Sequence, residues 1–178
     1  MKKKNKKKFN KIGLLGGSFD PPHLGHLYIS KLGIKKLKLN KLIWVVTKKN
    51  PLKQKPYLSL KLRMKLSKEI TKKEKKIFVQ FIDKKIKSSN TFNLLNYIKN
   101  KEKKSELFFL LGADSLIKFH KWKNWNKIPN LAKIVVFARQ NYTLKAFNSI
   151  AVKRFKKKDW LYIPGKKINI SSSLIRKF

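Results

Sequence analysis

The sequence contains no cysteine, which excludes a disulfide framework, a thiolate zinc site and a cysteine nucleophile. Stability must therefore come from packing, and a chain of 178 residues is long enough for one domain with a substantial core. Hydrophobic residues make up 42% of the chain, which argues against intrinsic disorder in spite of the charge. We expect a single folded domain.

Acidic residues are scarce as well, because 8 Asp and Glu stand against 47 Lys and Arg, giving a formal net charge of +39. Such a charge attracts polyanions: ATP, nucleic acid or acidic membranes. The lysines are spread over every segment, however, whereas nucleic-acid-binding proteins tend to gather basic residues, with arginine prominent, on one face. A genome rich in lysine codons explains the spread equally well. We therefore expect no specific nucleic-acid partner, only weak adhesion to RNA at low salt.

Long apolar stretches are also missing. No run approaches the roughly 20 residues of a membrane span. The basic start leads into the apolar run 12–15, which is shorter than the roughly 7 to 15 residues of a signal-peptide core. We expect a cytoplasmic protein without a membrane partner, in which residues 1–10 form a basic flexible tail and residues 11–178 the folded domain.

Short apolar runs alternate with longer segments of helical periodicity, and this alternation predicts a parallel sheet covered by helices. The expected strands are residues 11–15, 42–46, 77–82, 107–111, 134–138 and 161–163. The expected helices are 24–37, 58–70, 91–99 and 114–119, with a last short turn from residue 172. The fold class predicted is α/β, a Rossmann-like doubly wound parallel sheet in three α/β/α layers. In such sheets ligands bind beyond the carboxyl ends of the strands.

The segment GGSFDPPHLGH, residues 16–26, connects the first expected strand to the first expected helix. Gly16 and Gly17 would permit backbone angles and a close ligand approach that a Cβ would block, and the two prolines stiffen the turn. His23 and His26 lie three apart at the helix start, on one face, and Gly25 leaves room beside them. A single histidine there is more often structural, but this pair at a helix N-terminus favours a site for phosphate oxygens.

This segment resembles the signature of the H-x-G-H nucleotidyltransferase superfamily, and its double glycine and double proline most resemble bacterial nicotinate mononucleotide adenylyltransferases. In that family the phosphate of the mononucleotide attacks the α-phosphorus of ATP and expels pyrophosphate. The resemblance implies that His23 and His26 hold the phosphates and stabilise the pentavalent transition state. A phosphate monoester is already an anionic nucleophile, so this reaction needs no general base, which suits a chain poor in carboxylates.

Two later segments resemble the same family. Residues 112–116, GADSL, resemble a block whose turn contacts the nucleotides, and the resemblance implies that Trp122 stacks on the nicotinate ring. From the residues alone, Asp114 is equally well a helix cap, Trp125 is a core aromatic, and His120 receives no role. Residues 170–176, ISSSLIR, resemble the family's motif that grips the β- and γ-phosphates of ATP, with a serine in place of its usual threonine.

Weaker resemblances place Lys53 near the mononucleotide phosphate, Thr91 at a helix start beside the acceptor, and Arg139 at a strand end before a mobile loop. The resemblance as a whole implies ATP-binding residues and mononucleotide-binding residues, with Mg²⁺ arriving on ATP and no metal site of the protein's own. The ATP set is Gly16, Gly17, Ser18, Phe19, Gly25, Ser171, Ser172, Ser173 and Arg176. The mononucleotide set is Lys53, Thr91, Gly112, Asp114 and Trp122.

Two other functions remain open at this point. One is a different adenylyltransferase of the superfamily, such as phosphopantetheine adenylyltransferase. The other is a basic nucleic-acid-binding protein that has kept the same fold. The sequence also leaves open a homo-oligomer, the choice between the acid and the amide mononucleotide, and the effect of the short segment after Arg176.

Overall fold

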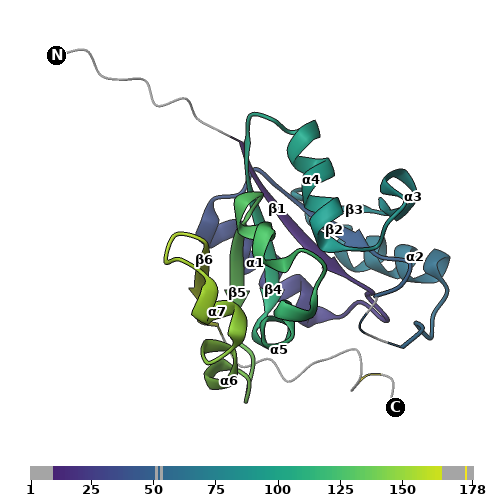
Figure 1. Ribbon diagram of the computed structural model, residues 1–178. Coiled ribbons are helices and arrows are strands. Elements are labelled where there is room, and N and C mark those ends of the chain that lie inside the picture. The colour runs from purple at the N-terminus through teal and green to yellow at the C-terminus, as the bar shows by residue number, and fades with distance from the viewer. Residues whose placement is uncertain (1–9, 51, 53, 166–174, 176–178) are drawn as a thin grey trace.

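A computed structural model describes residues 10–50, 52, 54–165 and 175. Six strands form one sheet in the order β3-β2-β1-β4-β5-β6, and every neighbouring pair is parallel. β3 and β6 lie at the two edges of this sheet (Figure 1). The strands are β1 (Asn10–Gly17), β2 (Lys41–Val46), β3 (Ile77–Gln80), β4 (Ser105–Gly112), β5 (Lys133–Phe137) and β6 (Trp160–Ile163).

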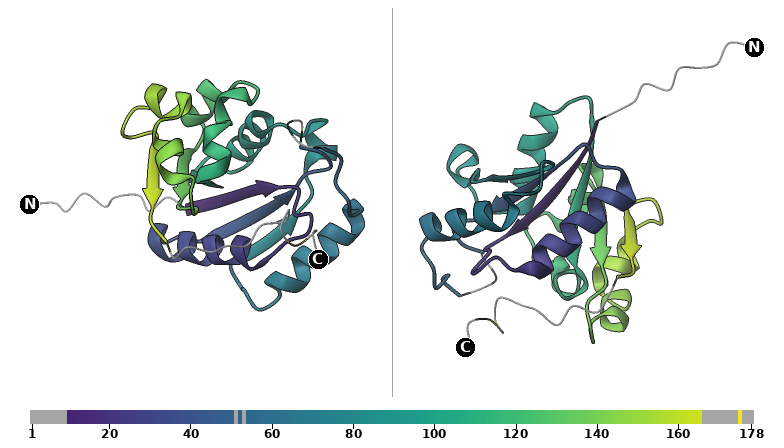
Figure 2. Two further views of the ribbon diagram at one scale, coloured as in Figure 1. Left: turned by 90° about the horizontal axis from the view of Figure 1, so that it is seen from below. Right: turned by 180° about the vertical axis from the view of Figure 1, so that it is seen from behind.

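Helices cover both faces of the sheet, as Figure 2 shows in its left view. One face carries α1 (Leu24–Leu37) and α2 (Leu60–Thr71). The opposite face carries α3 (Asp83–Ile86), α4 (Thr91–Lys101), α5 (Ala113–Ile117), α6 (Thr143–Phe147) and α7 (Ile150–Arg154), with the 3₁₀ helices η1 (Phe119–Lys121) and η2 (Trp125–Asn130). The predicted Rossmann-like, three-layer α/β fold is confirmed.

Side chains of the central strands alternate between two buried clusters. In β4, Leu107, Phe109 and Leu111 pack under the α4 and α5 layer, whereas Phe108 and Leu110 pack under α1 and α2. Successive residues of a strand point to opposite faces, so a strand covered on both faces must be apolar throughout. That requirement explains the continuous apolar runs in the sequence.

Several element boundaries differ from the prediction. β3 ends at Gln80 rather than at residue 82, because Ile82 already precedes α3 as its N-cap. α2 begins at Leu60 rather than at residue 58, since the Ser59 side chain accepts a hydrogen bond from Leu62 N and caps the helix. The predicted helix 114–119 is divided into α5 and η1. The short helices α3, α6 and α7 were not predicted, and the expected tail and the turn from residue 172 lie outside the described residues.

Helix α1 approaches the sheet closely. A Cβ built on Gly33 would lie 2.8 Å from Leu110 Cδ2 and 3.3 Å from the Phe137 ring, so a larger residue here would have to displace the buried Leu110 side chain. The helix is also tied to β2, because Trp44 Nε1 donates to Ser30 Oγ at 2.7 Å and Ser30 Oγ donates to the carbonyl of His26 at 2.7 Å. These contacts fix the position of α1 over the strand ends.

A buried arginine joins the loops at the carboxyl edge of the sheet. Arg63, in α2, is 2% exposed. Its Nη1 donates to the carbonyls of Ser18 at 2.6 Å and Thr47 at 2.8 Å, its Nε to Leu58 at 3.1 Å, and its Nη2 to Lys48 at 3.2 Å. One side chain thus connects the segments that follow β1 and β2 to the start of α2.

Two buried carboxylates accompany this cation. Asp20 accepts hydrogen bonds at 2.9 Å from the backbone N–H groups of residues 57 and 58, and Asp83 accepts one at 2.8 Å from Lys48 N. Burial lowers the pKa of Arg63, while the charges of Asp20 and Asp83 raise it. The guanidinium, the carboxylates and the backbone groups form one hydrogen-bonded unit beneath the strand ends.

We expect Arg63→Met to destabilise the fold by roughly 3–5 kcal/mol, because the carbonyls and carboxylates would stay buried without their cation. Urea unfolding followed by circular dichroism measures the difference. The control is Lys65→Met on the exposed side of the same helix, which should change stability by no more than about 0.5 kcal/mol. Equal midpoints for the two variants would show that the Arg63 network does not support the fold.

Candidate functional site

A cavity of about 1070 Å³ opens at the carboxyl ends of the strands. Residues of β1 and β4 line it, and these are the central strands, from which the chain winds outwards in both directions. This is the position at which doubly wound sheets bind ligands. Every predicted site residue that the structure describes lines this one cavity: Gly16, Gly17, Ser18, Phe19, His23, Gly25, His26, Thr91, Gly112, Asp114 and Trp122. Lys53, Ser171, Ser172, Ser173 and Arg176 lie outside the described residues.

The two histidines cap helix α1 reciprocally. His23 is the N-cap residue, with extended backbone angles, and its Nδ1 accepts a hydrogen bond from Gly25 N at 3.1 Å. His26 Nδ1 in turn accepts one from His23 N at 3.2 Å. This is a capping box, built here from two imidazoles. The ring centroids lie 3.8 Å apart, so the pair is brought together, although His23 precedes the helix instead of standing on its face.

Capping determines which nitrogen of each ring carries hydrogen. A neutral imidazole has one donor and one acceptor nitrogen, and because Nδ1 is the acceptor in both rings, the hydrogen resides on Nε2. Burial, and then the positive charge of Arg139, lower the pKa of His23 to about 4. His23 is therefore neutral at pH 7 and presents an Nε2–H donor on a ring that lines the cavity.

The glycine pair does not supply unusual backbone angles, so that expectation was wrong. Gly16 and Gly17 continue β1 in register with β2 as ordinary strand residues, and no described glycine has a positive φ. The left-handed residue of the turn is Phe19, with φ of 48°. Its buried ring stacks on Trp44 with centroids 4.8 Å apart and touches the His26 ring at 4.8 Å. Phe19 thus supports an imidazole from the core side.

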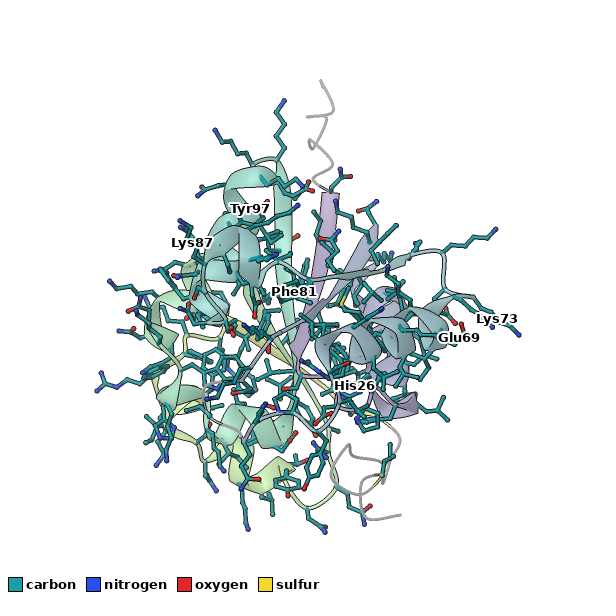
Figure 3. The ribbon with its side chains drawn as sticks, turned by 90° about the vertical axis from the view of Figure 1, so that its right-hand side faces the viewer. His26, Glu69, Lys73, Phe81, Lys87 and Tyr97 are labelled. Carbon is teal, nitrogen blue, oxygen red and sulfur yellow. The ribbon has the colours of Figure 1, made fainter. Side chains whose placement is uncertain are left out.

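Figure 3 locates His26 in the whole molecule. The residue lies inside the outline of the fold, below α2 in that view, whereas Lys73 and Lys87 lie towards its periphery. His26 is in van der Waals range of aromatic rings on two sides, since its centroid also lies 5.9 Å from that of Trp44. This aromatic packing leaves the ring little freedom to reorient.

Asp114 is not a helix cap. The N-cap of α5 is Gly112, which makes no side-chain capping bond, and Asp114 Oδ2 instead accepts a hydrogen bond from Arg139 Nη1 at 2.5 Å. A Cβ on Gly112 would lie 2.6 Å from Asp114 Oδ1, so the glycine makes room for this carboxylate. Trp122 borders the cavity, and its ring packs against Phe119 with centroids 4.7 Å apart.

Trp125 packs against the core, as expected. Many cavity residues were absent from the sequence-based site prediction, Arg139 and Thr47 among them. Arg139 was predicted only as a strand end. It lies two residues beyond β5, and β5 pairs with β4, the strand that leads into Asp114 at the start of α5. Thr47 follows β2 on the cavity wall, and its buried hydroxyl has no hydrogen-bond partner among the described residues. Position after a parallel strand was the available signal for both.

The described carboxylates do not gather into a metal site. No group of three or more His, Cys, Asp or Glu side chains in the described ranges could hold a metal ion. The cavity contains the carboxylates Asp20, Asp83 and Asp114, and each already accepts hydrogen bonds from the protein. Nor is any helix in the described part of the chain long and apolar enough to cross a membrane.

Comparisons with known proteins agree with this geometry. A profile of the cytidylyltransferase-like family matches residues 14–178. The chain is 46% identical over 173 residues to a probable nicotinate-nucleotide adenylyltransferase of Pelagibacter ubique, covering 97% of this chain and 95% of that protein. It is 37% identical over 135 residues to one of a Ruegeria species, covering 76% and 71%.

Solved structures share the fold. Nicotinic acid mononucleotide adenylyltransferase of Plasmodium falciparum, complexed with NaAD, superposes with a TM-score of 0.76 and covers 95% of this chain and 83% of that one. The sequence identity in this comparison is 22%, so the superposition supports the architecture rather than any particular residue.

The depressed pKa of His23 predicts a pH effect on stability. The folded ring has a pKa of about 4, against 6.5 for an ordinary histidine, so between these values the unfolded chain binds a proton that the folded chain does not. Stability is therefore lost as the pH falls through this window. His23→Asn keeps a capping oxygen but cannot titrate.

The melting temperature of His23→Asn, relative to that of the unsubstituted chain, should consequently rise as the pH is lowered from 6.5 to 4 and stay constant above 7. Because the two chains differ at one residue, all other titrating groups cancel in the comparison. Parallel melting curves across the whole range would contradict the neutral, buried imidazole.

Proposed function

Because this chain belongs to the nicotinate-nucleotide adenylyltransferase family, we propose that it transfers the AMP part of ATP to nicotinate mononucleotide. The products are nicotinate adenine dinucleotide and pyrophosphate, in the adenylylation step of NAD biosynthesis. The observation that carries the proposal is the pair of capping imidazoles at the N-terminus of α1, in a cavity at the switch point of a doubly wound sheet.

The cavity is large and extended enough to be compared with the space that two nucleotides need. Pockets for single small molecules usually measure about 300 to 1,000 Å³, and this cavity reaches about 1070 Å³. Its lining runs from the α1 start, with His23 and His26, to Thr91 at the start of α4 and Trp122 beyond α5. ATP at the first region and the mononucleotide at the second would meet above the end of β1.

At the α1 start, binding and charge stabilisation use the same groups. A helix N-terminus carries partial positive charge that suits phosphate oxygens, although the capping box already uses the N–H groups of His23 and Gly25. His23 and His26 would add Nε2–H donors to the oxygens of the α-phosphate, where charge is redistributed as the phosphate of the acceptor attacks. Because these donors are fixed by capping before substrate arrives, little reorganisation is required during the reaction.

At the acceptor end, Trp122 would stack on the pyridine ring, since its ring borders the cavity and is held by Phe119. Gly112 and Asp114 line the same cavity at the start of α5, and Thr91 offers a hydroxyl from α4. Lys53, Ser171 to Ser173 and Arg176 remain proposals for the phosphates. Mg²⁺ would arrive on ATP and neutralise phosphate charge, held largely by phosphate oxygens and water.

The acceptor preference tests the proposal most directly. Purified protein is incubated with ATP, Mg²⁺ and one acceptor, and pyrophosphate release is measured for nicotinate mononucleotide, nicotinamide mononucleotide and phosphopantetheine. We expect the largest kcat/KM with nicotinate mononucleotide. A larger value with phosphopantetheine would move the chain to another reaction of the superfamily, and absence of turnover with all three, beside tight RNA binding that persists at high salt, would favour a nucleic-acid-binding protein.

A second test concerns the histidines. His26→Asn should lower kcat by about 100- to 1,000-fold, the usual effect of removing one preorganised donor. The variant should still fold, because an amide oxygen can accept from His23 N, with some loss of melting temperature from the ring contact with Phe19. Wild-type rates in a folded His26→Asn variant would remove His26 from the proposed mechanism. The cytoplasmic location and a homo-oligomeric state stay predictions.

A further inference from the structure

Arg139 differs from the other cations of the cavity. Four cationic side chains occur among the described lining residues: the exposed lysines Lys55, Lys121 and Lys123, and the part-buried Arg139. Its guanidinium lies 5.7 Å from the centroid of the Tyr142 ring, donates to Asp114, and is close enough for its charge to act on His23. Arg139 therefore stands between the α1 start and the Asp114 turn.

The ion pair between Arg139 and Asp114 is weak. The side chains of Arg139 and Asp114 are 34% and 27% exposed, and an ion pair with this access to water usually changes an equilibrium by no more than about fivefold. Arg63 is the contrast, since it is 2% exposed and spends its donors on four carbonyls. Arg139 can change partner, whereas Arg63 cannot.

A polyphosphate is the stronger competitor for this guanidinium. It carries several negative charges against the single charge of Asp114, and arginine makes paired hydrogen bonds to phosphate oxygens. We propose that Arg139 leaves Asp114 when ATP enters the cavity and binds the phosphate oxygens that lie at His23. Asp114 holds Arg139 at the cavity wall before ATP binds, and Tyr142 lies under the guanidinium in that position. This inference rests on the proposed function, which makes ATP the ligand.

The test is a double-mutant cycle on the affinity for a non-hydrolysable ATP analogue with Mg²⁺ and without acceptor, measured by calorimetry at fixed salt. Arg139→Gln should weaken binding about 10- to 100-fold, since charged hydrogen bonds to phosphate are lost. Asp114→Asn should strengthen binding by up to about fivefold, because it removes the competitor. Arg139→Lys should recover part of the loss, since lysine keeps the charge but not the paired geometry.

The double variant distinguishes two explanations for the effect of Asp114. Either Asp114 competes with ATP for Arg139, or its negative charge repels ATP directly. If Asp114 acts by holding Arg139, Asp114→Asn gives no gain in the Arg139→Gln background, and the two effects are not additive. An equal gain in both backgrounds would show that Asp114 merely repels the ligand, and would overturn the proposal. Lys121→Gln removes one positive charge from the same cavity and should weaken binding less than about threefold.

The outcomes also separate this inference from the proposed function. An unsubstituted chain that neither binds the analogue nor transfers AMP would refute the function, and the exchange with it. A chain that binds and transfers normally, with additive substitutions, would refute only the exchange. A loss of equal size in Arg139→Gln and Asp114→Asn would assign the pair a structural role, which also contradicts the proposal.

Discussion

The hydrogen bonds of Arg63 are the constraint on which the edge of the sheet depends. A parallel sheet brings the ends of its strands together, but nothing in strand pairing holds the loops beyond those ends. Here one guanidinium donates hydrogen bonds to carbonyls in the loops after β1 and β2 and at the start of α2. The negative charges of Asp20 and Asp83 offset its positive charge. The network reaches the cavity, because Ser18, Asp20, Thr47 and Asp83 all belong to the cavity wall, and buried polar groups that satisfy one another hold such loops in place.

At the start of α1, the same side chains stabilise the fold and face the cavity. His23 and His26 each use one nitrogen to cap the helix, which leaves the other nitrogen with hydrogen. Folding and chemistry therefore do not compete for these residues: the bond that starts the helix also sets the tautomer that the proposed reaction needs. Phe19 and Trp44 then hold the His26 ring from the core. A serine or aspartate cap would start α1 equally well but would supply no ring.

The sequence predicted the sheet and the location of the site because both depend on local patterns: continuous apolar runs for β4 and β5, and residues 16–26 for the cavity edge. It failed where distant segments meet. Arg63 is one of only four arginines, but its buried role depends on loops that lie far apart in the sequence, and Arg139 pairs with a residue 25 positions away. The expectation of unusual backbone angles at Gly16 and Gly17 was wrong, because both glycines belong to β1 and the left-handed residue is Phe19.

Gly33 lies seven residues beyond His26 in the same helix, about two turns or roughly 10 Å along the axis. A short helix moves as a rigid rod, so any side chain that lifted α1 from Leu110 would displace the imidazoles together with it. Position 33 does not line the cavity, yet a side chain there would act on the imidazoles through the helix that carries both.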